Sequence, residues 1–301
     1  MLKINKPSEK NRNIYKRLII AGIIIILLLS FFYYENNHLV LTSYAVSSDK
    51  LSASFNDYKI IHISDLHDAS FGKNNIKLIK LIKAQDPDII VITGDMVDSK
   101  NSNINKVIDL YKELSNISEI YYVTGNHEYW LEDNDLQTLF SELQKIGIHI
   151  LNNEGVKVSS TDNCSYINLY GLNDKDLSDN TINNLAITED SYNILLAHEP
   201  QYFDKYASAN ADLILAGHAH GGQFNIPFIG PIIAPDQGFF PKYAMGEYSQ
   251  NNSTMIVNRG LGNSVIPVRL FNDPEIVSIV LHGTKQENDF YETEAIDYSD
   301  S

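Results

Sequence analysis

Cysteine and positive charge are both scarce in this chain of 301 residues. Cys164 is the only cysteine, which excludes a disulfide within the chain and leaves at most one thiolate as a metal ligand. Lysine and arginine number 23 against 38 aspartates and glutamates, so the net charge is −15. Nonspecific binding to nucleic acid needs a basic surface, so we expect no nucleic-acid partner. A site for more than one metal ion in this chain must therefore be built from His, Asp, Asn and Glu.

One uncharged, apolar run stands near the N-terminus, from Leu18 to Tyr34, after a segment rich in lysine and arginine. Its length is at the lower end of the roughly 17 to 25 residues that span a bilayer. Positive charge before the run places residues 1–17 in the cytoplasm and the rest of the chain outside. We therefore predict a single-pass membrane anchor over 18–34. The alternative is a signal peptide that is cleaved near residues 43–45, which would release a secreted protein.

The remaining chain divides into a linker over residues 35–57, a body over 58–284 and an acidic tail over 285–301. We expect an edge strand within the linker. In the body, apolar strands at 60–63, 88–93 and 119–124 alternate with amphipathic helices at 73–84, 103–114 and 136–146. This alternation predicts an α/β fold with buried sheets. Closely spaced strands at 148–151, 156–159 and 166–170 predict a second, more antiparallel sheet.

Five apolar runs end in residues that bind metals. They are IIHISDLH (60–67), IIVITGDMVD (89–98), IYYVTGNHE (120–128), ILLAHEP (194–200) and LILAGHAHGGQ (213–223). Ligands of α/β proteins collect outside the carboxyl ends of the strands, so these side chains are expected to meet. The candidate metal ligands are Asp65, His67, Asp95, Asn126 with the adjacent imidazole of His127, His198, His218 and His220. Oxygen ligands mixed with imidazoles suit two divalent ions of the borderline class, such as Mn, Fe, Zn or Ni.

The order D-x-H, G-D-x-x-D, G-N-H-E, H, G-H-x-H resembles the calcineurin-like metallophosphoesterase superfamily over residues 58–281. The segments GHAHGGQFNIPFIGPIIAP and NRGLGNSVIPVRLFNDPEI are similar to its bacterial, membrane-anchored branch. The resemblance implies a four-layer α/β/β/α sandwich with a dinuclear metal site at the carboxyl ends of the strands. It also implies a metal-dependent hydrolase of phosphate esters, in which two ions about 3.5 to 4 Å apart clamp the phosphoryl group and activate a water.

The same resemblance implies a role for each ligand. One ion would be held by Asp65, His67 and His220, and the other by Asn126, His198 and His218, with Asp95 as the bridge. His127 would stand beside the leaving-group oxygen as a proton donor, and Asp98 would orient it.

Two departures from the family pattern bear on the substrate. Phosphoprotein phosphatases of the superfamily carry phosphate-gripping arginines after G-D-x-x-D and G-N-H-E, where this chain has Ser99 and Tyr129. A diester carries less charge than a monoester, so we expect a phosphodiester of lipid, envelope or nucleotide type. The alternatives are a phosphomonoesterase and a non-catalytic binding module that retains the fold. Arg259 and Arg269 are either phosphate contacts or members of structural salt bridges.

Other conspicuous residues lie beside the five runs or outside them. The histidines outside the five runs are expected to be structural or on the surface: His38, His62, His149 and His282. Glu128 and Glu199 are expected to hydrogen-bond near the ligands and not to bind metal. Tyr129 and Trp130 either wall the substrate cleft or pack against the body. The apolar stretch 226–235 is either a lip that dips into lipid or a buried loop over the site.

Overall fold

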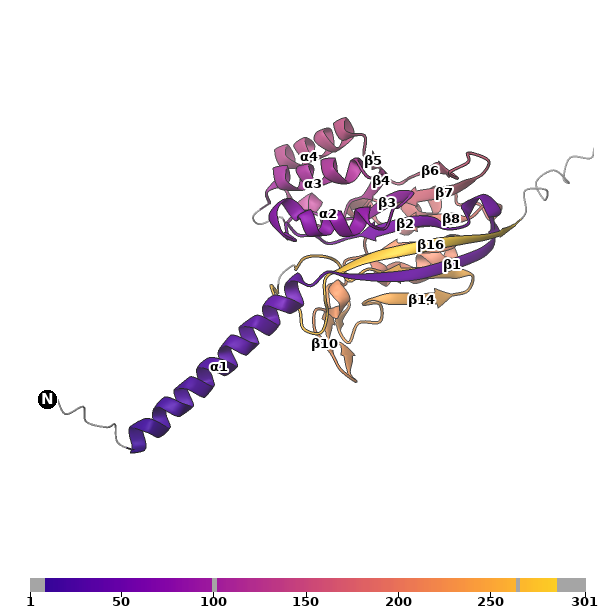
Figure 1. The fold of residues 1–301 in the computed structure, drawn as a ribbon. Helices are drawn as coiled ribbons and strands as arrows, with labels where there is room; N and C mark the ends of the chain where they lie inside the picture. The colour runs from indigo at the N-terminus through magenta and orange to yellow at the C-terminus, as the bar shows by residue number, and fades with distance from the viewer. Residues whose placement is uncertain (1–8, 99–101, 264–265, 286–301) are drawn as a thin grey trace, which may run out of the picture.

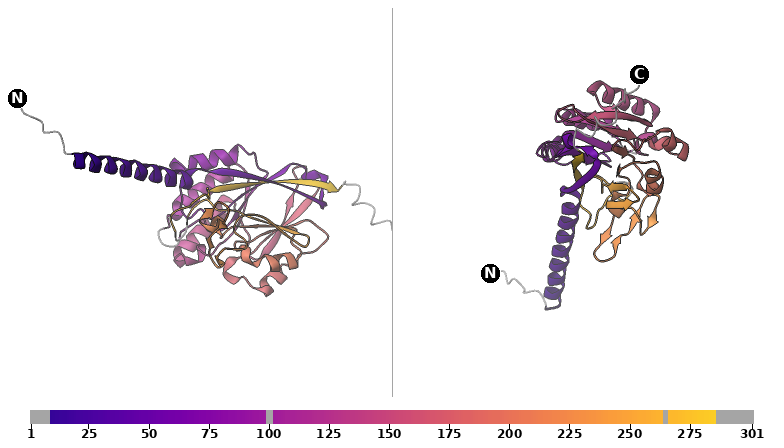
Figure 2. Two further views of the ribbon diagram at one scale, coloured as in Figure 1. Left: turned by 90° about the horizontal axis from the view of Figure 1, so that it is seen from below. Right: turned by 90° about the vertical axis from the view of Figure 1, so that its right-hand side faces the viewer.

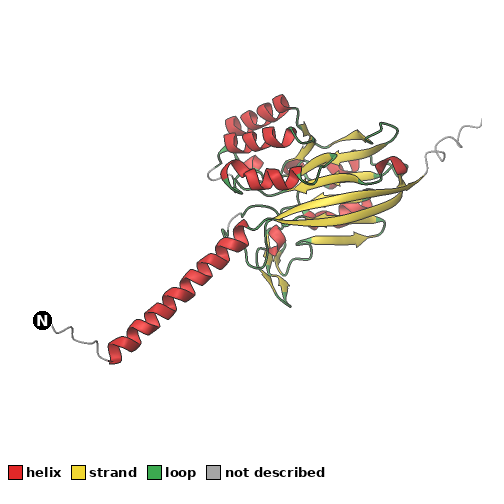
Figure 3. Cartoon of the chain, viewed as in Figure 1, coloured by secondary structure: helices red, strands yellow, loops and turns green. Residues whose placement is uncertain are grey.

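The computed structural model describes residues 9–98, 102–263 and 266–285. Two six-stranded sheets face each other, and helices cover the outer face of each sheet (Figure 1, Figure 3). The body is therefore the predicted four-layer α/β/β/α sandwich.

The first sheet has the strand order β1-β16-β2-β3-β4-β5. Its strands are β1 Val40–Ser52, β16 Glu275–Lys285, β2 Tyr58–Ile63, β3 Ile89–Thr93, β4 Glu119–Val123 and β5 His149–Ile150. Every neighbouring pair is parallel except β16 with β2. The linker that was predicted over residues 35–57 thus contains β1, the edge strand of this sheet. β1 pairs with β16, which comes from the other end of the chain.

Three helices cover the outer face of the first sheet: α2 Ile76–Lys83, α3 Ile104–Ser115 and α4 Asp133–Ile146. Their apolar faces form one buried cluster with the sheet, in which Leu78 and Leu110 pack with Ile61 and Ile92. Gly147 ends α4 with φ 90°, a left-handed conformation that glycine adopts at little cost.

The second sheet has the strand order β14-β15-β9-β8-β7-β6. Its strands are β14 Gly246–Gln250, β15 Ser253–Val257, β9 Leu213–Ala216, β8 Asn193–Leu196, β7 Tyr166–Gly171 and β6 Glu154–Ser159. Antiparallel pairs occur only at the two edges, β14 with β15 and β6 with β7. The interior is parallel because α5 Asp179–Asn184 and α6 Phe203–Ser208 carry the chain back between β7, β8 and β9.

A second buried cluster fills the space between the two sheets. It joins Ile60 and Val91 of the first sheet to Ile194 and Leu215 of the second. A third cluster lies between the second sheet and its helices, where Phe203 and Tyr206 of α6 pack on Ile214. Strands that are buried on both faces read as continuous apolar runs, which explains why β2, β3, β8 and β9 were visible in the sequence.

Two small hairpins follow the last predicted ligand. Asn225–Ile226 (β10) pairs with Gly230–Pro231 (β11), and Ile233–Ala234 (β12) pairs with Gly238–Phe239 (β13). The stretch 226–235 therefore spans the first hairpin and the beginning of the second. Its turn carries Phe228 and Ile229, both exposed.

Helix α1, Glu9–Asn37, extends away from the body as a rod (Figure 2). Residues Asn13–Asn37 are long and apolar enough to cross a membrane, and only 6% of their apolar window is buried. The predicted span over 18–34 lies inside this helix. Of the acidic tail that was predicted over 285–301, only Lys285, at the end of β16, lies within the described residues.

Candidate metal centre

The carboxyl ends of β2, β3, β4, β8 and β9 lie together and bring the predicted ligands to one place. Glycines allow the loops after these strands to approach closely. A Cβ atom at Gly125 would collide with the Asp95 carboxylate and the His198 ring, and one at Gly217 would collide with Ser64 and Asp65. Gly94, which precedes Asp95, has φ 89°, a conformation that favours glycine.

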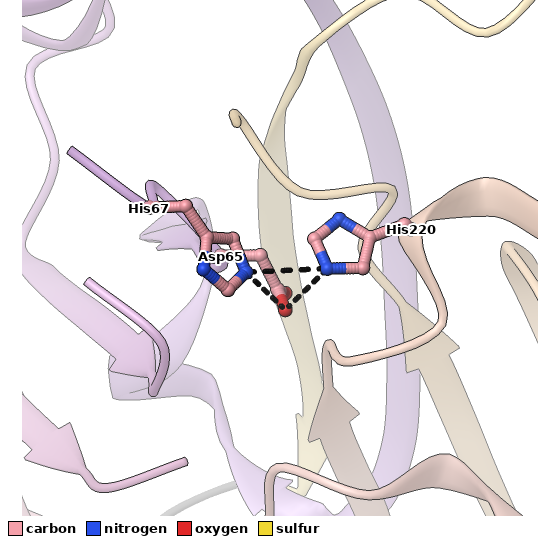
Figure 4. A group of neighbouring side chains, drawn as sticks. All are labelled: Asp65, His67 and His220. Atoms are coloured by element: carbon pink, nitrogen blue, oxygen red, sulfur yellow. Dashed lines mark hydrogen bonds and ion pairs between the residues drawn. The ribbon is translucent and has the colours of Figure 1, made fainter. Parts of the chain in front are cut away.

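Asp65, His67 and His220 form the first group of potential ligands (Figure 4). The Nε2 atoms of the two histidines are 3.2 Å apart. Oδ1 of Asp65 lies 3.9 Å from His67 Nε2 and 3.6 Å from His220 Nε2. All three side chains are buried, so an ion between them would be shielded from solvent.

Asp95, His198 and His218 form the second group, with Asn126 beside them. His198 Nε2 lies 3.0 Å from His218 Nδ1, 3.2 Å from Asn126 Oδ1 and 3.3 Å from Asp95 Oδ2. Asn126, which the sequence analysis grouped with these two histidines, thus lies next to His198.

Asp95 stands between the two groups. Its Oδ2 atom lies 3.6 Å from His67 Nε2 and 3.3 Å from His198 Nε2, so one oxygen faces both sets. Its Oδ1 atom accepts a hydrogen bond from the backbone N–H of His127 at 2.9 Å, which fixes the carboxylate. A bridging ligand needs this position.

The hydrogen bonds of the second group test whether its residues fit a cation. His198 Nδ1 lies 2.6 Å from the carbonyl oxygen of Thr93, so Nδ1 carries the proton and Nε2 points a lone pair at the centre. His218 Nε2 lies 2.9 Å from Asp236 Oδ2, which likewise leaves its Nδ1 lone pair facing inward. Nitrogen and oxygen ligand atoms thus converge on one point, and a metal ion satisfies this arrangement.

The electrostatics agree with this fit. Burial lowers the pKa of His67 and places that of His220 well below its usual value, so both imidazoles are neutral and can act as ligands. Burial alone would also lower the pKa of His198, yet the Asp95 and Asp65 carboxylates raise it well above its usual value. The second group therefore stabilises positive charge. Together the two groups fit two divalent ions.

Glu128 binds the backbone of two loops that carry the candidate ligands. Its carboxylate accepts hydrogen bonds from the backbone N–H groups of Asp95 (3.0 Å), Met96 (2.9 Å) and Gly125 (2.8 Å). The residue thus joins the loop after β3 to the loop after β4, in line with the expected hydrogen-bonding role. Burial and the nearby Asp95 charge raise the pKa of Glu128 to about 7.

The predicted proton donor and its orienting carboxylate lie at the edge of the centre. His127 Nδ1 is 3.9 Å from Asp98 Oδ1, and His127 Nε2 is 3.9 Å from Asp95 Oδ2. The His127 ring also lies against Trp130, with the ring centroids 4.4 Å apart. Trp130 is exposed and can wall the approach to His127.

Four positions bear on phosphate binding. They are the two positions where the family pattern has arginine, and the two candidate arginines. Tyr129 accepts a hydrogen bond from the Thr124 hydroxyl at 3.1 Å, whereas Ser99 lies outside the described residues. Arg259 pairs with Glu275 at 3.0 Å, and the buried Arg269 donates to backbone carbonyl groups, including that of Arg259 at 2.9 Å. Arg259 is therefore a member of a structural salt bridge, whereas Arg269 is held by backbone carbonyl groups and not by a carboxylate.

Sequence reasoning missed two partners of the ligands, the Thr93 carbonyl and Asp236. A backbone carbonyl has no sequence signal. Asp236 lies in the turn of the second hairpin and does not follow a long apolar strand, so the pattern that identified the other acids does not reach it.

The family model of calcineurin-like phosphoesterases matches residues 58–222. The Bacillus subtilis metallophosphoesterase YkuE is 31% identical over 81% of this chain and 85% of its own length. A Bos taurus transmembrane protein with a metallophosphoesterase domain is 29% identical over 80% of this chain and 56% of its own length. Among solved structures, a Danio rerio dimetal phosphatase aligns with a TM-score of 0.49 at 11% identity, covering 75% of this chain and 93% of that one.

Proposed function

Because the chain belongs to the calcineurin-like phosphoesterase family and is a metal-dependent phosphoester hydrolase, we propose that it cleaves phosphodiesters from a membrane-anchored position outside the cytoplasm. The preference for a diester is supported by the contacts of the two candidate arginines, which are already bound within the protein. Arg259 is paired with Glu275, Arg269 is buried among carbonyls, and Tyr129 stands at one of the two expected arginine positions. A monoester dianion would need more positive charge than a diester does.

The ligand assignment follows the two groups. Asp65, His67 and His220 would hold one ion, Asn126, His198 and His218 would hold the other, and Asp95 would be shared between them. When bound, two divalent ions stabilise charge on the phosphoryl oxygens and lower the pKa of the attacking water. Mn, Fe, Zn or Ni suits this set of oxygen and imidazole donors. The protein itself holds the donors still, since Glu128 fixes the loop of Asp95 and the Thr93 carbonyl fixes the His198 ring.

His127 is the proposed general acid. A protonated imidazole beside the cleaved bond gives its proton to the departing alkoxide oxygen, which is otherwise a poor leaving group. Asp98, with Oδ1 3.9 Å from His127 Nδ1, orients the ring. Trp130 lies against the same ring and keeps it in place.

Anchoring by an uncleaved α1 is part of the proposal. The end of α1 is built into the body, because Asn36 Oδ1 accepts hydrogen bonds from Asn263 Nδ2 at 2.9 Å and from the Arg269 N–H at 3.2 Å. Cleavage near residues 43–45 would cut β1 inside the first sheet. With lysine and arginine before the span, residues 1–17 stay in the cytoplasm, 18–34 cross the bilayer, and the body lies outside.

The test is metal-dependent turnover by the full chain in detergent, because β1 begins at Val40 and a shorter version would lose part of the sheet. The protein is stripped of metal, given Mn or Zn, and assayed with bis-p-nitrophenyl phosphate and p-nitrophenyl phosphate. We expect metal to restore turnover, with a higher kcat/KM for the diester. A clear preference for the monoester would replace the diester with a phosphomonoesterase. Turnover of neither compound by protein with two bound ions would contradict the proposed activity.

A further inference from the structure

Large apolar side chains gather on the two hairpins that follow the metal ligands. Phe228 is fully exposed, and Ile229, Phe239 and Phe240 are exposed by 62%, 73% and 68%. We call these four residues the hairpin face. Leaving such side chains in water forgoes about 1.5 to 3 kcal/mol for each one that could be buried, so a concentrated set marks a contact surface.

The hairpin face is held on an ordered support. β10 pairs with β11, so Phe228 and Ile229 occupy the turn between them. Backbone bonds from Phe240 N to Ile232 O (2.8 Å) and from Ile232 N to Phe224 O (2.9 Å) fasten the second hairpin to the first. The face is therefore presented by a fixed pair of hairpins.

The same hairpins are joined to the foot of α1. Phe224 bridges Leu270, and the Asn225 N–H donates to the Leu270 carbonyl at 2.9 Å. The next residue, Phe271, places its ring 5.7 Å from the ring of Phe31 in α1. In Figure 1 and in the right-hand view of Figure 2, the hairpins extend from the body on the side from which α1 leaves.

Phe31 sets the level of this contact. It lies inside the span over 18–34, so the Phe271 ring that touches it lies at the level of the outer membrane boundary if α1 crosses the bilayer. Phe271 is itself half exposed. The first hairpin is hydrogen-bonded to Leu270, the residue before Phe271. The hairpins are therefore expected at the same boundary.

We propose that the hairpin face and Phe271 dock on the bilayer that α1 crosses, with their side chains in the headgroup and upper acyl region. We assign the partner of this face as lipid because α1 is fixed to the body. A bilayer around α1 therefore meets these apolar side chains. This proposal rests on the anchoring proposed above.

Docking would also fix the position of the metal centre relative to the bilayer. Asp236, in the turn of the second hairpin, contacts His218 at 2.9 Å, and a Cβ at Gly222 would collide with Pro231 of the first hairpin. The hairpins are thus packed directly on the ligand loop. A bilayer under them holds the centre beside lipid headgroups and brings lipid phosphodiesters within its reach.

The experiment uses the full chain in phosphatidylethanolamine–phosphatidylglycerol vesicles, with Cys164→Ser as the background, since Cys164 is exposed. Phe228→Cys and Phe239→Cys variants carry a polarity-sensitive fluorophore, and nitroxide-labelled acyl chains serve as quencher. Leu28→Cys in α1 is the membrane reference. Tyr166→Cys, at the amino end of β7 and half exposed, is the aqueous control. Turnover of bis-p-nitrophenyl phosphate by each labelled variant checks that it is folded.

We expect the labels at 228 and 239 to lose about half of their emission to the quencher and to shift to shorter wavelength, whereas the label at 166 does neither. If 228 and 239 behave like 166 while 28 is quenched, the docking is wrong and the anchor stands. If 28 is not quenched, the anchoring itself is wrong. Shielding at 228 that disappears on dilution of protein in lipid would assign the face to a second copy of the chain and overturn the lipid assignment.

Discussion

The Nε2 atom of His218 lies 2.9 Å from the carboxylate of Asp236, while its Nδ1 atom faces His198 at 3.0 Å. Asp236 thus keeps the proton on Nε2 and leaves the Nδ1 lone pair for a metal. Hydrogen bonds of this kind orient an imidazole and make it a better ligand. The Asp236 side chain is 63% exposed, so its removal should not disturb the core.

We therefore expect Asp236→Asn to lower the affinity for one metal ion by about 10- to 100-fold. Titration against a fluorescent chelator measures both binding steps. Asp109→Asn, at an exposed position on α3, is the matched control and should leave both steps unchanged. Two unaltered binding constants in Asp236→Asn would show that this contact does not support a ligand.

His127→Ala separates acid catalysis from metal binding. His127 lies beside both groups but is not in the proposed ligand set, so the variant should keep two ions and lose about 10²- to 10⁴-fold in kcat. The loss should be larger for a diester with an alkoxide leaving group than for bis-p-nitrophenyl phosphate, because p-nitrophenolate needs little help from a proton. An equal loss on both compounds would contradict the role of His127 as the acid.

Glu128→Ala should destabilise the body. The substitution leaves the buried N–H groups of Asp95, Met96 and Gly125 without their acceptor, at about 1 to 3 kcal/mol for each unsatisfied group. We expect the free energy of unfolding in urea to fall by roughly 3 kcal/mol or more. The exposed Glu132→Ala should change it by less than about 0.5 kcal/mol. Similar values for the two variants would show that Glu128 does not join the loops.

His62 gives a prediction for acid stability. It is buried in β2 with Nε2 2.8 Å from Thr93 Oγ1, and burial lowers its pKa from 6.5 to about 3. The unfolded chain therefore takes up a proton below pH 6.5 that the folded chain refuses until about pH 3. The contribution is fully present above pH 6.5 and is lost as the pH falls, by about 1.4 kcal/mol per pH unit within this window.

Urea unfolding at pH 7 and pH 5.5 measures this effect in wild type and in His62→Gln, which does not titrate there. The stability lost between the two pH values should be smaller in the variant by the amount that His62 contributes. Parallel losses in the two proteins would mean that His62 is protonated in the folded state.

The sequence predicted those parts of the fold that depend on local pattern. The strands β2, β3 and β4 begin and end within two residues of their predicted positions, because strands that are buried on both faces must be apolar throughout. The ligands were visible because each followed such a run and preceded or followed a turn. Their convergence then required only that parallel strands share one ligand-binding edge.

What could not be predicted depends on distant contacts. The pairing of Val40 with Glu275 joins the two ends of the body, and nothing in either local sequence specifies that partner. The strand predicted at 148–151 was expected in a more antiparallel second sheet, but β5 pairs in parallel with β4 of the first sheet. The second sheet itself is antiparallel only at its edges, because the short helix α5 was not recognised as a crossover between parallel strands. Asp236 contacts His218 only because a hairpin folds back over the ligand loop.

The most direct test of the account is turnover of bis-p-nitrophenyl phosphate as metal is added to the stripped full chain in steps from zero to two equivalents. With Asp95 facing both groups of ligands, we predict little activity at one equivalent and nearly all of it on addition of the second. Asp95→Asn should raise the amount of metal that is needed. Full activity at one equivalent, or none after two ions have bound, would contradict a two-metal phosphodiesterase.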